Sequence, residues 1–357
     1  MGAAGTRTAS SRVLANQRAS VDASSREAGA IIIGKAHTHE FALGVTTPQS
    51  RHPLDPTRNP GGSSGGSAIS VVTGMSVASL GTDTRASIRV PSALCGAVGY
   101  KPTFGLIPTD GVTTLSWSLD HIAPMAQNMS DIALLLDVLI LGGNYATALT
   151  KDVRGLRIGI PVSALDGAEP GVLKAFEHAV AMIEAAGCQI VRVEAPTKED
   201  FDLAVALGLI ISRSEATTYH RAFGDIHTNA ERYTRPVYEQ LDEAAHVSAA
   251  DYLQAQRWRT IVRQRVLAQL QRFDAMLMPT CLVTAPKSED VERYFMVLSQ
   301  NCILWSFIGV PAVSVPCGHT SDGLPVGAQL VACPFEDARL IAIAAALEAA
   351  LANAKQG

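Results

Sequence analysis

The chain has 357 residues, of which 47% are apolar and 17% are charged, and its formal net charge is −4. This composition is typical of a compact folded protein and excludes an intrinsically disordered one. The slightly acidic balance offers no basic surface for nucleic acid, and no uncharged apolar run reaches the length of a membrane span. We therefore expect neither a nucleic-acid partner nor a membrane segment.

The cysteines and the N-terminal sequence bear on metal binding and location. The six cysteines show no CxxC or Cys/His spacing, so neither a zinc site nor a disulfide framework is indicated. They are Cys95, Cys188, Cys281, Cys302, Cys317 and Cys333. The start of the chain carries arginines but no apolar core of a signal peptide. We expect a cytoplasmic protein without a metal, in which isolated histidines such as His37, His39 and His121 serve packing or hydrogen bonding.

The first half of the chain predicts few regular elements before its glycine-rich stretch. Residues 1–20 are small and polar, so we expect an irregular start, then a short helix ending near residue 28 and a buried strand at 30–34. Prolines punctuate residues 46–60 and predict a loop. Further on, Ser130 can cap a helix that ends at two glycines, Gly142 and Gly143.

The second half alternates strand and helix patterns. A βαβ unit is predicted from strands at 156–160 and 189–193 around a helix at 170–186. The further predicted elements are long helices at about 199–223 and 249–272, a strand that runs into a loop over 273–280, and a last helix at 336–352. Arginines 257, 259, 263, 265 and 272 are expected on the solvated side of the second long helix. Periodicity alone therefore predicts an α/β protein.

Two serine-bearing turns contain the candidate catalytic residues of the sequence. Residues 61–67 read GGSSGGS, residues 82–89 read TDTRASIR, and Ser63 and Ser87 lie 24 positions apart. A helix starting directly after the glycines would direct unpaired N–H groups and a positive dipole end at the first turn, which suits an oxyanion or an activated hydroxyl. A GGSSGGS string alone is typical of a flexible linker, but a linker is not normally followed by thirteen uncharged, mostly apolar residues.

The two turns and their spacing resemble the amidase signature family of serine hydrolases, which joins a GGSSGGS turn to a GTDTGGSIR-type turn. The resemblance extends through Pro91, Cys95 and the exit at 99–103, and covers the chain from about residue 25 to its end. It is weakest between about 195 and 270. It implies one domain over 1–357 with a large mixed β-sheet between layers of α-helices, from which the N-terminal portion of the family fold is missing.

Further segments follow the same resemblance. Residues 111–125, GVTTLSWSLDHIAPM, match a family loop near the rim of the active site. The stretches 309–316 and 323–330 match the terminal pair of strands in the family.

The resemblance also implies roles for the serines. Ser87 would be the nucleophile that forms an acyl-enzyme, and Ser63, on a cis peptide, would pass the proton to the leaving amine. Ser64 would help to orient Ser63. The backbone N–H groups of an oxyanion hole would come from Thr84, Arg85 and Ala86 together with the nucleophile itself.

Four other residues of the second turn have predicted structural or binding roles. Asp83 and Arg89 flank the nucleophile with opposite charges, and we expect a structural ion pair that holds the turn. Arg85 and Ala86 replace the Gly-Gly that is usual in the family. If either position needed a positive φ, the replacement would strain the loop; the alternative is that both lie in allowed regions. Arg85 would then project near the acyl pocket and favour a substrate that carries a carboxylate.

The third catalytic group of the family is a lysine, which must be neutral to accept a proton. The family places it several tens of residues before the first serine, in a segment that this chain lacks. The only lysine before Ser63 is Lys35, which aligns with a family lysine that is not the base. Arginine cannot replace it, because it stays protonated. Lys101 is the nearest other candidate in sequence, although its segment is structural in the family.

We therefore expect an N-terminally truncated amidase whose hydrolysis of a small carboxylic amide is impaired, with no cofactor. One alternative is the catalytic subunit of a tRNA-dependent amidotransferase, which belongs to the same family. A second alternative is a non-catalytic, degenerate fold that acts in binding or assembly. A homodimer is left open.

Overall fold

Eight strands form one mixed sheet in the computed structural model, which describes residues 20–222 and 226–354. Across the sheet the strands follow the order β1-β3-β2-β7-β8-β6-β4-β5. Strand β4 pairs in parallel with β5 and β6, and the other neighbouring pairs are antiparallel. The strands are β1 (Ala78–Asp83), β2 (Val98–Lys101), β3 (His121–Ala126), β4 (Arg157–Pro161), β5 (Gln189–Val193), β6 (Ala275–Pro279), β7 (Ala312–His319) and β8 (Pro325–Val331).

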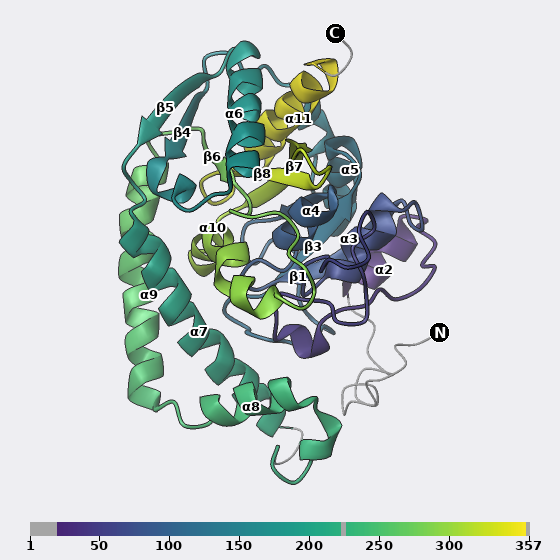
Figure 1. Ribbon diagram of the computed structural model, residues 1–357, viewed down its shortest axis with the longest axis vertical. Coiled ribbons are helices and arrows are strands. Elements are labelled where there is room, and N and C mark those ends of the chain that lie inside the picture. The colour runs from purple at the N-terminus through teal and green to yellow at the C-terminus, as the bar shows by residue number, and fades with distance from the viewer. Residues whose placement is uncertain (1–19, 223–225, 355–357) are drawn as a thin grey trace.

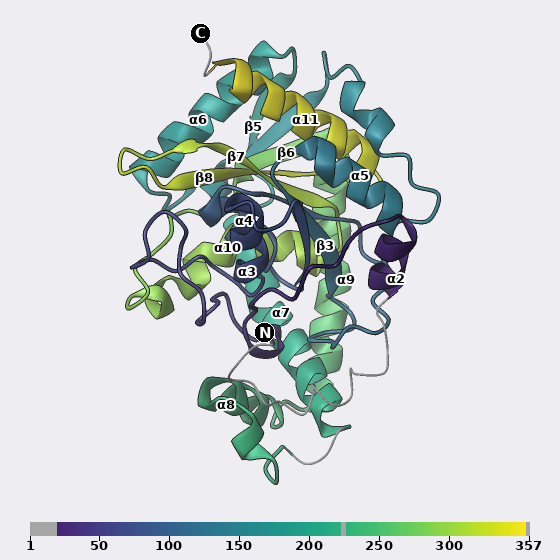
Figure 2. The same cartoon turned by 90° about the vertical axis from the view of Figure 1, so that its right-hand side faces the viewer.

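Helices cover both faces of this sheet (Figure 1). Figure 2 shows α5, α6 and α11 on one side of β7 and β8, and α3, α4 and α10 on the other. The helices are α2 (Ser20–Glu27), α3 (Gly65–Val72), α4 (Arg89–Cys95), α5 (Met129–Leu139), α6 (Pro170–Ala185), α7 (Lys198–Arg221), α8 (Arg235–Ala244), α9 (Ala249–Leu270), α10 (Phe295–Phe307) and α11 (Asp337–Ala354). The predicted arrangement, a mixed sheet between helical layers, is confirmed.

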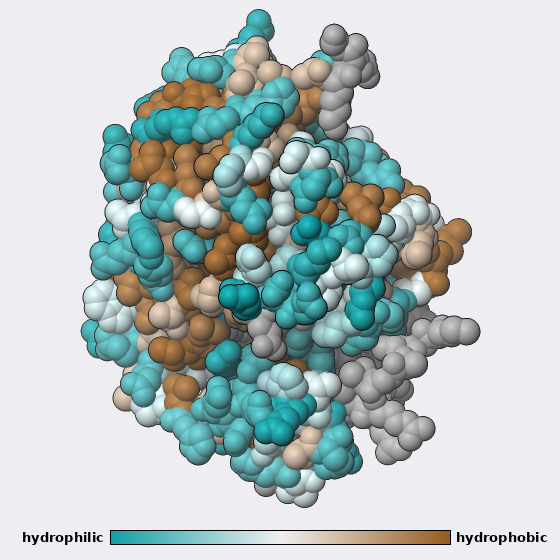
Figure 3. Space-filling model, in the orientation of Figure 1, coloured by the Kyte–Doolittle hydropathy of each residue, from teal (hydrophilic) through white to brown (hydrophobic). Residues whose placement is uncertain are grey.

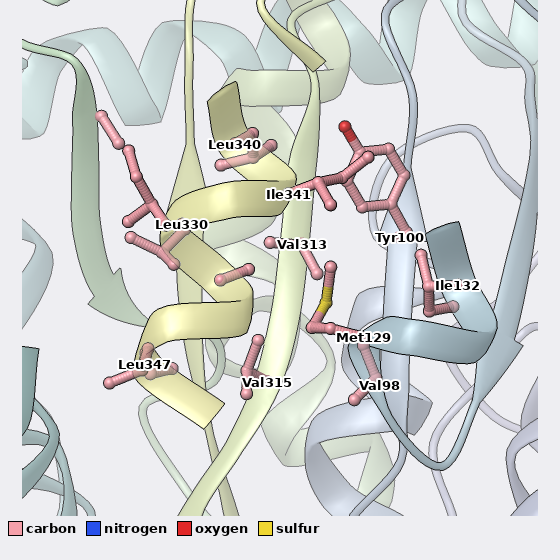
Figure 4. Packing of buried hydrophobic residues seen from close by; sticks show 14 of the residues in the cluster. Val98, Tyr100, Met129, Ile132, Val313, Val315, Leu330, Leu340, Ile341 and Leu347 are labelled. Atoms are coloured by element: carbon pink, nitrogen blue, oxygen red, sulfur yellow. The ribbon is translucent and has the colours of Figure 1, made fainter. Parts of the chain in front are cut away.

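The larger core lies between the sheet and the layer of α5, α6 and α11. Alternate residues of a strand point to the same face, so Val313 and Val315 of β7 both meet α11 (Figure 4). Tyr100 of β2 is fully buried there, and its hydroxyl donates to Asp337 Oδ1 at 3.0 Å. A buried tyrosine needs such a partner, and this bond ties the sheet to the start of α11.

The opposite layer is longer than the sheet. Helices α7 and α9 pack against one another, and both extend beyond the strands toward α8 (Figure 1). Both long helices match their predicted positions, whereas α8 was not predicted. On the face seen in Figure 3, apolar surface lies in separate patches among polar residues. No helix of residues 20–222 and 226–354 has the length and apolarity needed to cross a membrane.

Three predictions of local structure were wrong. Residues 30–34 form no strand and lie exposed, with Ile31 at 87% exposure, because the segment pairs with none of the eight strands and an apolar run alone does not make a strand. Residues 121–125, the end of the segment assigned to a loop, belong to β3 despite Pro124. Helix α5 is capped by Asn128, not Ser130: the Asn128 side chain accepts from Asp131 N at 2.8 Å, while Ser130 already lies inside the helix.

The arginines of α9 follow their prediction except at Arg259. Most of their side chains are exposed as expected, but Arg259 is half-buried and its Nε donates to the carbonyl of Phe307 at 2.6 Å. Arg263 Nε donates to the carbonyl of Ile308 at 2.9 Å. These carbonyls lie at the end of α10, where unsatisfied C=O groups attract cations. The irregular start expected at 1–20 falls almost entirely outside the described residues.

Candidate active site

The first serine turn is fastened by the chain that precedes it. His39 N donates to the carbonyl of Ser63 at 2.9 Å. Thr47 Oγ1 donates to the carbonyl of Gly61 and accepts from Gly65 N, both at 3.0 Å. The single hydroxyl of Thr47 thus joins the two ends of the turn, and Ser63 is held between them with 1% of its surface exposed.

The backbone at the first turn requires glycine for a steric reason. The peptide between Gly62 and Ser63 is cis, as the resemblance implies. A Cβ atom on Gly62 would lie 2.1 Å from the carbonyl oxygen of Thr46, so no larger residue fits without moving the backbone.

Ser64 connects the two serine turns. Its N–H donates to the carbonyl of Ser87 at 3.2 Å, and its hydroxyl accepts from Thr82 N at 3.3 Å. The hydroxyl fits only because Gly81 has no side chain: a Cβ there would lie 2.6 Å from Ser64 Oγ. The fold therefore places Ser63 and Ser87 on adjoining turns, and Ser87 is also buried, at 6% exposure. The predicted helix α3 is present, but it begins directly after Ser64 and so includes Gly65 and Gly66 instead of starting after them.

Behind the second turn lies the ion pair expected from the sequence. Arg89 Nε donates to Asp83 Oδ2 at 2.9 Å and Nη2 donates to Oδ1 at 3.0 Å, and both side chains are fully buried. Burial acts to raise the pKa of Asp83, but the charge and hydrogen bond of Arg89, together with Lys101 and His121, outweigh it and hold the pKa at about 2. The remaining acceptors of Arg89 are Cys302 O, Gln329 Oε1, Ser306 Oγ and Arg85 O. Every nitrogen of this guanidinium is used, and one bond fixes the carbonyl of the turn itself.

Sequence reasoning missed Asp120, which supports the same turn from the other side. Its Oδ1 accepts from Thr84 Oγ1 at 2.6 Å. Its Oδ2 accepts from Thr114 Oγ1, Leu115 N and Ser116 N at 2.7–3.0 Å. Burial raises the pKa of this carboxyl, against the lowering effect of its bonds. The signal was present in the sequence, since Asp120 is the acidic residue of the rim segment 111–125.

The residues predicted to form an oxyanion hole adopt an unstrained backbone. The non-glycine residues with positive φ in the described chain are Phe41, Ala42 and Phe335, so Arg85 and Ala86 both lie in ordinary regions. The replacement of Gly-Gly therefore imposes no backbone strain. The N–H groups of Arg85, Ala86 and Ser87 donate to no backbone carbonyl within residues 20–222 and 226–354, which leaves them available to an oxyanion.

A narrow pocket opens in front of the second turn. Its walls include Thr84, Arg85, Ala86 and Ser87 from the turn, Leu43 and its neighbours, and Arg213 from α7. A larger surface cavity, about 460 Å³, is lined by the end of α9, the segment before β6 and the start of α11, with residues such as Phe273 and Arg339, and contains no residue of either serine turn.

Neither lysine considered from the sequence is hydrogen-bonded to a serine. Lys35 is exposed. Lys101 is fully buried at the end of β2, and its Nζ donates to the carbonyls of Val310 and Pro102. Burial, with the nearby Arg89 charge, lowers the pKa of Lys101 to about 7. A neutral amine has two N–H donors, which match these two carbonyls.

His121 has the hydrogen-bonding role that was expected of it. Its Nδ1 lies 3.0 Å from the carbonyl oxygen of Asp83, and Phe104 packs edge-on against its ring. Burial lowers the pKa of His121 well below its ordinary value, so it is uncharged at neutral pH.

Comparison with known proteins identifies the family that combines this mixed α/β fold with two adjoining serine turns. The family model described as Amidase matches residues 4–341. An amidase from Pseudomonas putida is 37% identical over 322 residues, covering 84% of this chain and 68% of that protein. A glutamyl-tRNA(Gln) amidotransferase subunit from Chloroflexus aurantiacus is 36% identical, covering 94% of this chain and 78% of that protein. A crystal structure of an amidase superimposes with a TM-score of 0.84 at 30% identity, covering 93% of this chain and 77% of that one. The chain belongs to the amidase signature family.

Proposed function

We propose that this protein hydrolyses a small carboxylic amide through an acyl-enzyme on Ser87. The observation that carries the proposal is the placement of Ser87 beside three free N–H groups, its own and those of Arg85 and Ala86, at the wall of a pocket. An amide is a poor electrophile, so its hydrolysis needs both a nucleophile and donors for the developing oxyanion. Membership of the amidase signature family supports the same reaction class.

The steps follow from this arrangement. Ser87 Oγ attacks the amide carbon, and its proton passes by way of Ser63 to the leaving nitrogen as the C–N bond breaks. The free N–H groups of the second turn stabilise the oxyanion that forms in between. Water then attacks the ester on Ser87, which releases the carboxylic acid and restores the hydroxyl. We further propose that the enzyme is cytoplasmic, as the cysteines and the N-terminal sequence predict, and that it needs no cofactor, as the family resemblance implies.

The rate depends on the group that receives the proton. Lys101 is anchored to two carbonyls and Lys35 is exposed, so neither is held against Ser63. We therefore propose that the 357-residue chain acylates slowly, by about 10²- to 10⁴-fold relative to a form with a lysine beside Ser63.

Ammonia release tests the proposal. A panel of small primary amides is offered to the chain, to its Ser87→Ala variant, and to a form extended upstream with a family-type lysine segment. We expect measurable turnover in the extended form, much weaker turnover in the chain itself, and none above background in either form once Ser87 is alanine. Equal turnover with and without Ser87 would reject the serine as nucleophile.

A second candidate function is supported by the 36% identity to an amidotransferase subunit. In that case the released ammonia would be passed to a second substrate with the help of partner subunits. Co-purification of tagged protein from its own cells distinguishes the two, since an independent amidase retains activity without any stoichiometric partner. Concentration-dependent size without any turnover would instead favour the non-catalytic alternative.

A further inference from the structure

The pocket in front of Ser87 contains a guanidinium in which two buried nitrogens lack hydrogen-bond partners. Arg85 Nε and Nη2 are both buried, and neither forms a hydrogen bond with any described residue. Burial, and secondly the charge of Arg213, lower the pKa of Arg85 to about 10, which still leaves it a cation at neutral pH. Burial of unsatisfied charged donors is costly, and such groups are normally paired.

A second arginine lines the same pocket from α7. Arg213 lies far along the chain from the serine turns, in the segment least like the rest of the family, yet the fold brings it to the pocket that Arg85 lines. Its Nη2 donates to Gln240 Oε1 at 3.2 Å. Its Nη1 lies 3.9 Å from Glu243 Oε2, and the Glu243 side chain is 72% exposed, so this ion pair is weak. Two cations therefore face the pocket with little neutralisation.

The other residues that line the pocket supply no negative charge. Apart from Arg85 and Arg213, the described lining residues are apolar or neutral, and the polar ones include Ser212 and Ser299. An entering anion would therefore meet attraction without a competing carboxylate. Arginine is the side chain best suited to a carboxylate, because its planar fork can donate two parallel hydrogen bonds.

We propose that this pocket binds a carboxylate carried by the acyl part of the substrate, so that the preferred substrates are monoamides of short dicarboxylic acids. Arg85 lies two positions before Ser87 on one turn, so the bound carboxylate and the reacting amide must be separated by only a few carbons. This inference rests on the proposed amide hydrolysis and names its substrate class. The carboxylate would supply the acceptors that Arg85 lacks, and Arg213 would bind it from the α7 wall.

A binding measurement on an inactive variant tests the carboxylate pocket independently of catalysis. Calorimetry is performed on the Ser87→Ala protein with succinate, which resembles the acyl product, and with succinamide, which has the same skeleton without charge. We expect succinate to bind at least tenfold more tightly than succinamide. Arg85→Gln and Arg213→Gln should each weaken succinate at least tenfold and leave succinamide unchanged. Arg257→Gln is the matched control, because Arg257 is exposed on α9 away from the pocket, and it should bind succinate normally.

The outcomes are distinguishable from those of the hydrolysis assay. Equal affinity for succinate and succinamide, or full succinate affinity in Arg85→Gln, would overturn the carboxylate pocket even if amides are hydrolysed at Ser87. Tight, arginine-dependent succinate binding without any Ser87-dependent turnover would keep the pocket and reject the hydrolase. Thermal unfolding of each variant confirms that lost binding does not reflect a lost fold.

Discussion

Two arginines of one turn, four positions apart, have opposite surroundings. Arg89 lies behind the turn, where a carboxylate, a hydroxyl, an amide oxygen and two carbonyls accept all its donors. Arg85 lies in front, where two of its nitrogens have no partner among the described residues. The two sides of the turn therefore have different roles. Behind the turn, hydrogen bonds fix its backbone; in front of it, donors remain available to a ligand.

The hydrogen bonds behind the turn support the residues in front of it. The Arg89 network includes the carbonyl of Arg85. The backbone that carries Arg85 is therefore fixed from behind the turn, by groups other than those that would bind the substrate. Asp120 fixes Thr84 in the same way. A rigid support of this kind allows the front face to carry unsatisfied donors, which a flexible loop would turn toward water.

The largest expected effect is at the back of the turn. Arg89→Met leaves the Asp83 carboxylate buried without its cation, and removal of one partner of a buried ion pair costs about 3–5 kcal/mol. We expect a loss of that size in the free energy of unfolding, measured by urea denaturation. A loss below about 1 kcal/mol would show that the network does not hold the turn.

Lys101 permits a test through pH, since it lies on the same side of the turn as Arg89. Its pKa in the folded chain is about 7, below the ordinary 10.5, so between these values the unfolded chain carries the extra proton and stability rises with pH. Below pH 7 the lysine is protonated in both the folded and the unfolded chain, so Lys101 adds no slope to the dependence of stability on pH. We expect Lys101→Met to remove a slope of about 1.4 kcal/mol per pH unit from the wild-type curve. Parallel curves for both proteins would contradict a neutral buried amine.

The smallest expected effect, of opposite sign, is at the front. Arg85→Met replaces a cation that has two buried, unpartnered nitrogens with an apolar chain of similar length, so without ligand the free energy of unfolding should rise by about 1 kcal/mol. The variant should keep its fold while losing the preference for carboxylate-bearing amides. Destabilisation similar to that of Arg89→Met would mean that both arginines are structural and that the comparison fails.

Much of this arrangement could be predicted from the sequence, and the reasons for the gaps are physical. The long periodic helices and the serine turns have local signals, and α7, α9 and the adjoining turns were predicted. Strand β3 was missed because Pro124 and the rim pattern favoured a loop. The strand expected at 30–34 depends on a pairing partner, which no local pattern reports.

The site shows the same division. The Asp83–Arg89 pair has a local signal, because both residues flank one turn. Arg213 had none: it comes from the least matched segment, and only the packing of α7 brings it to the pocket. The sequence also could not predict that two nitrogens of Arg85 lack partners, because this depends on which acceptors the rest of the fold places near them.

Site mapping after covalent labelling tests the central claim most directly. The chain and its lysine-bearing extension are treated with a fluorophosphonate, and the modified peptide is located by mass spectrometry. The account predicts one label per chain on Ser87, strong in the extended form, weak in the unextended chain and absent from Ser87→Ala. A label that persists in Ser87→Ala, or that maps to another residue, would contradict the assignment of Ser87 as the nucleophile.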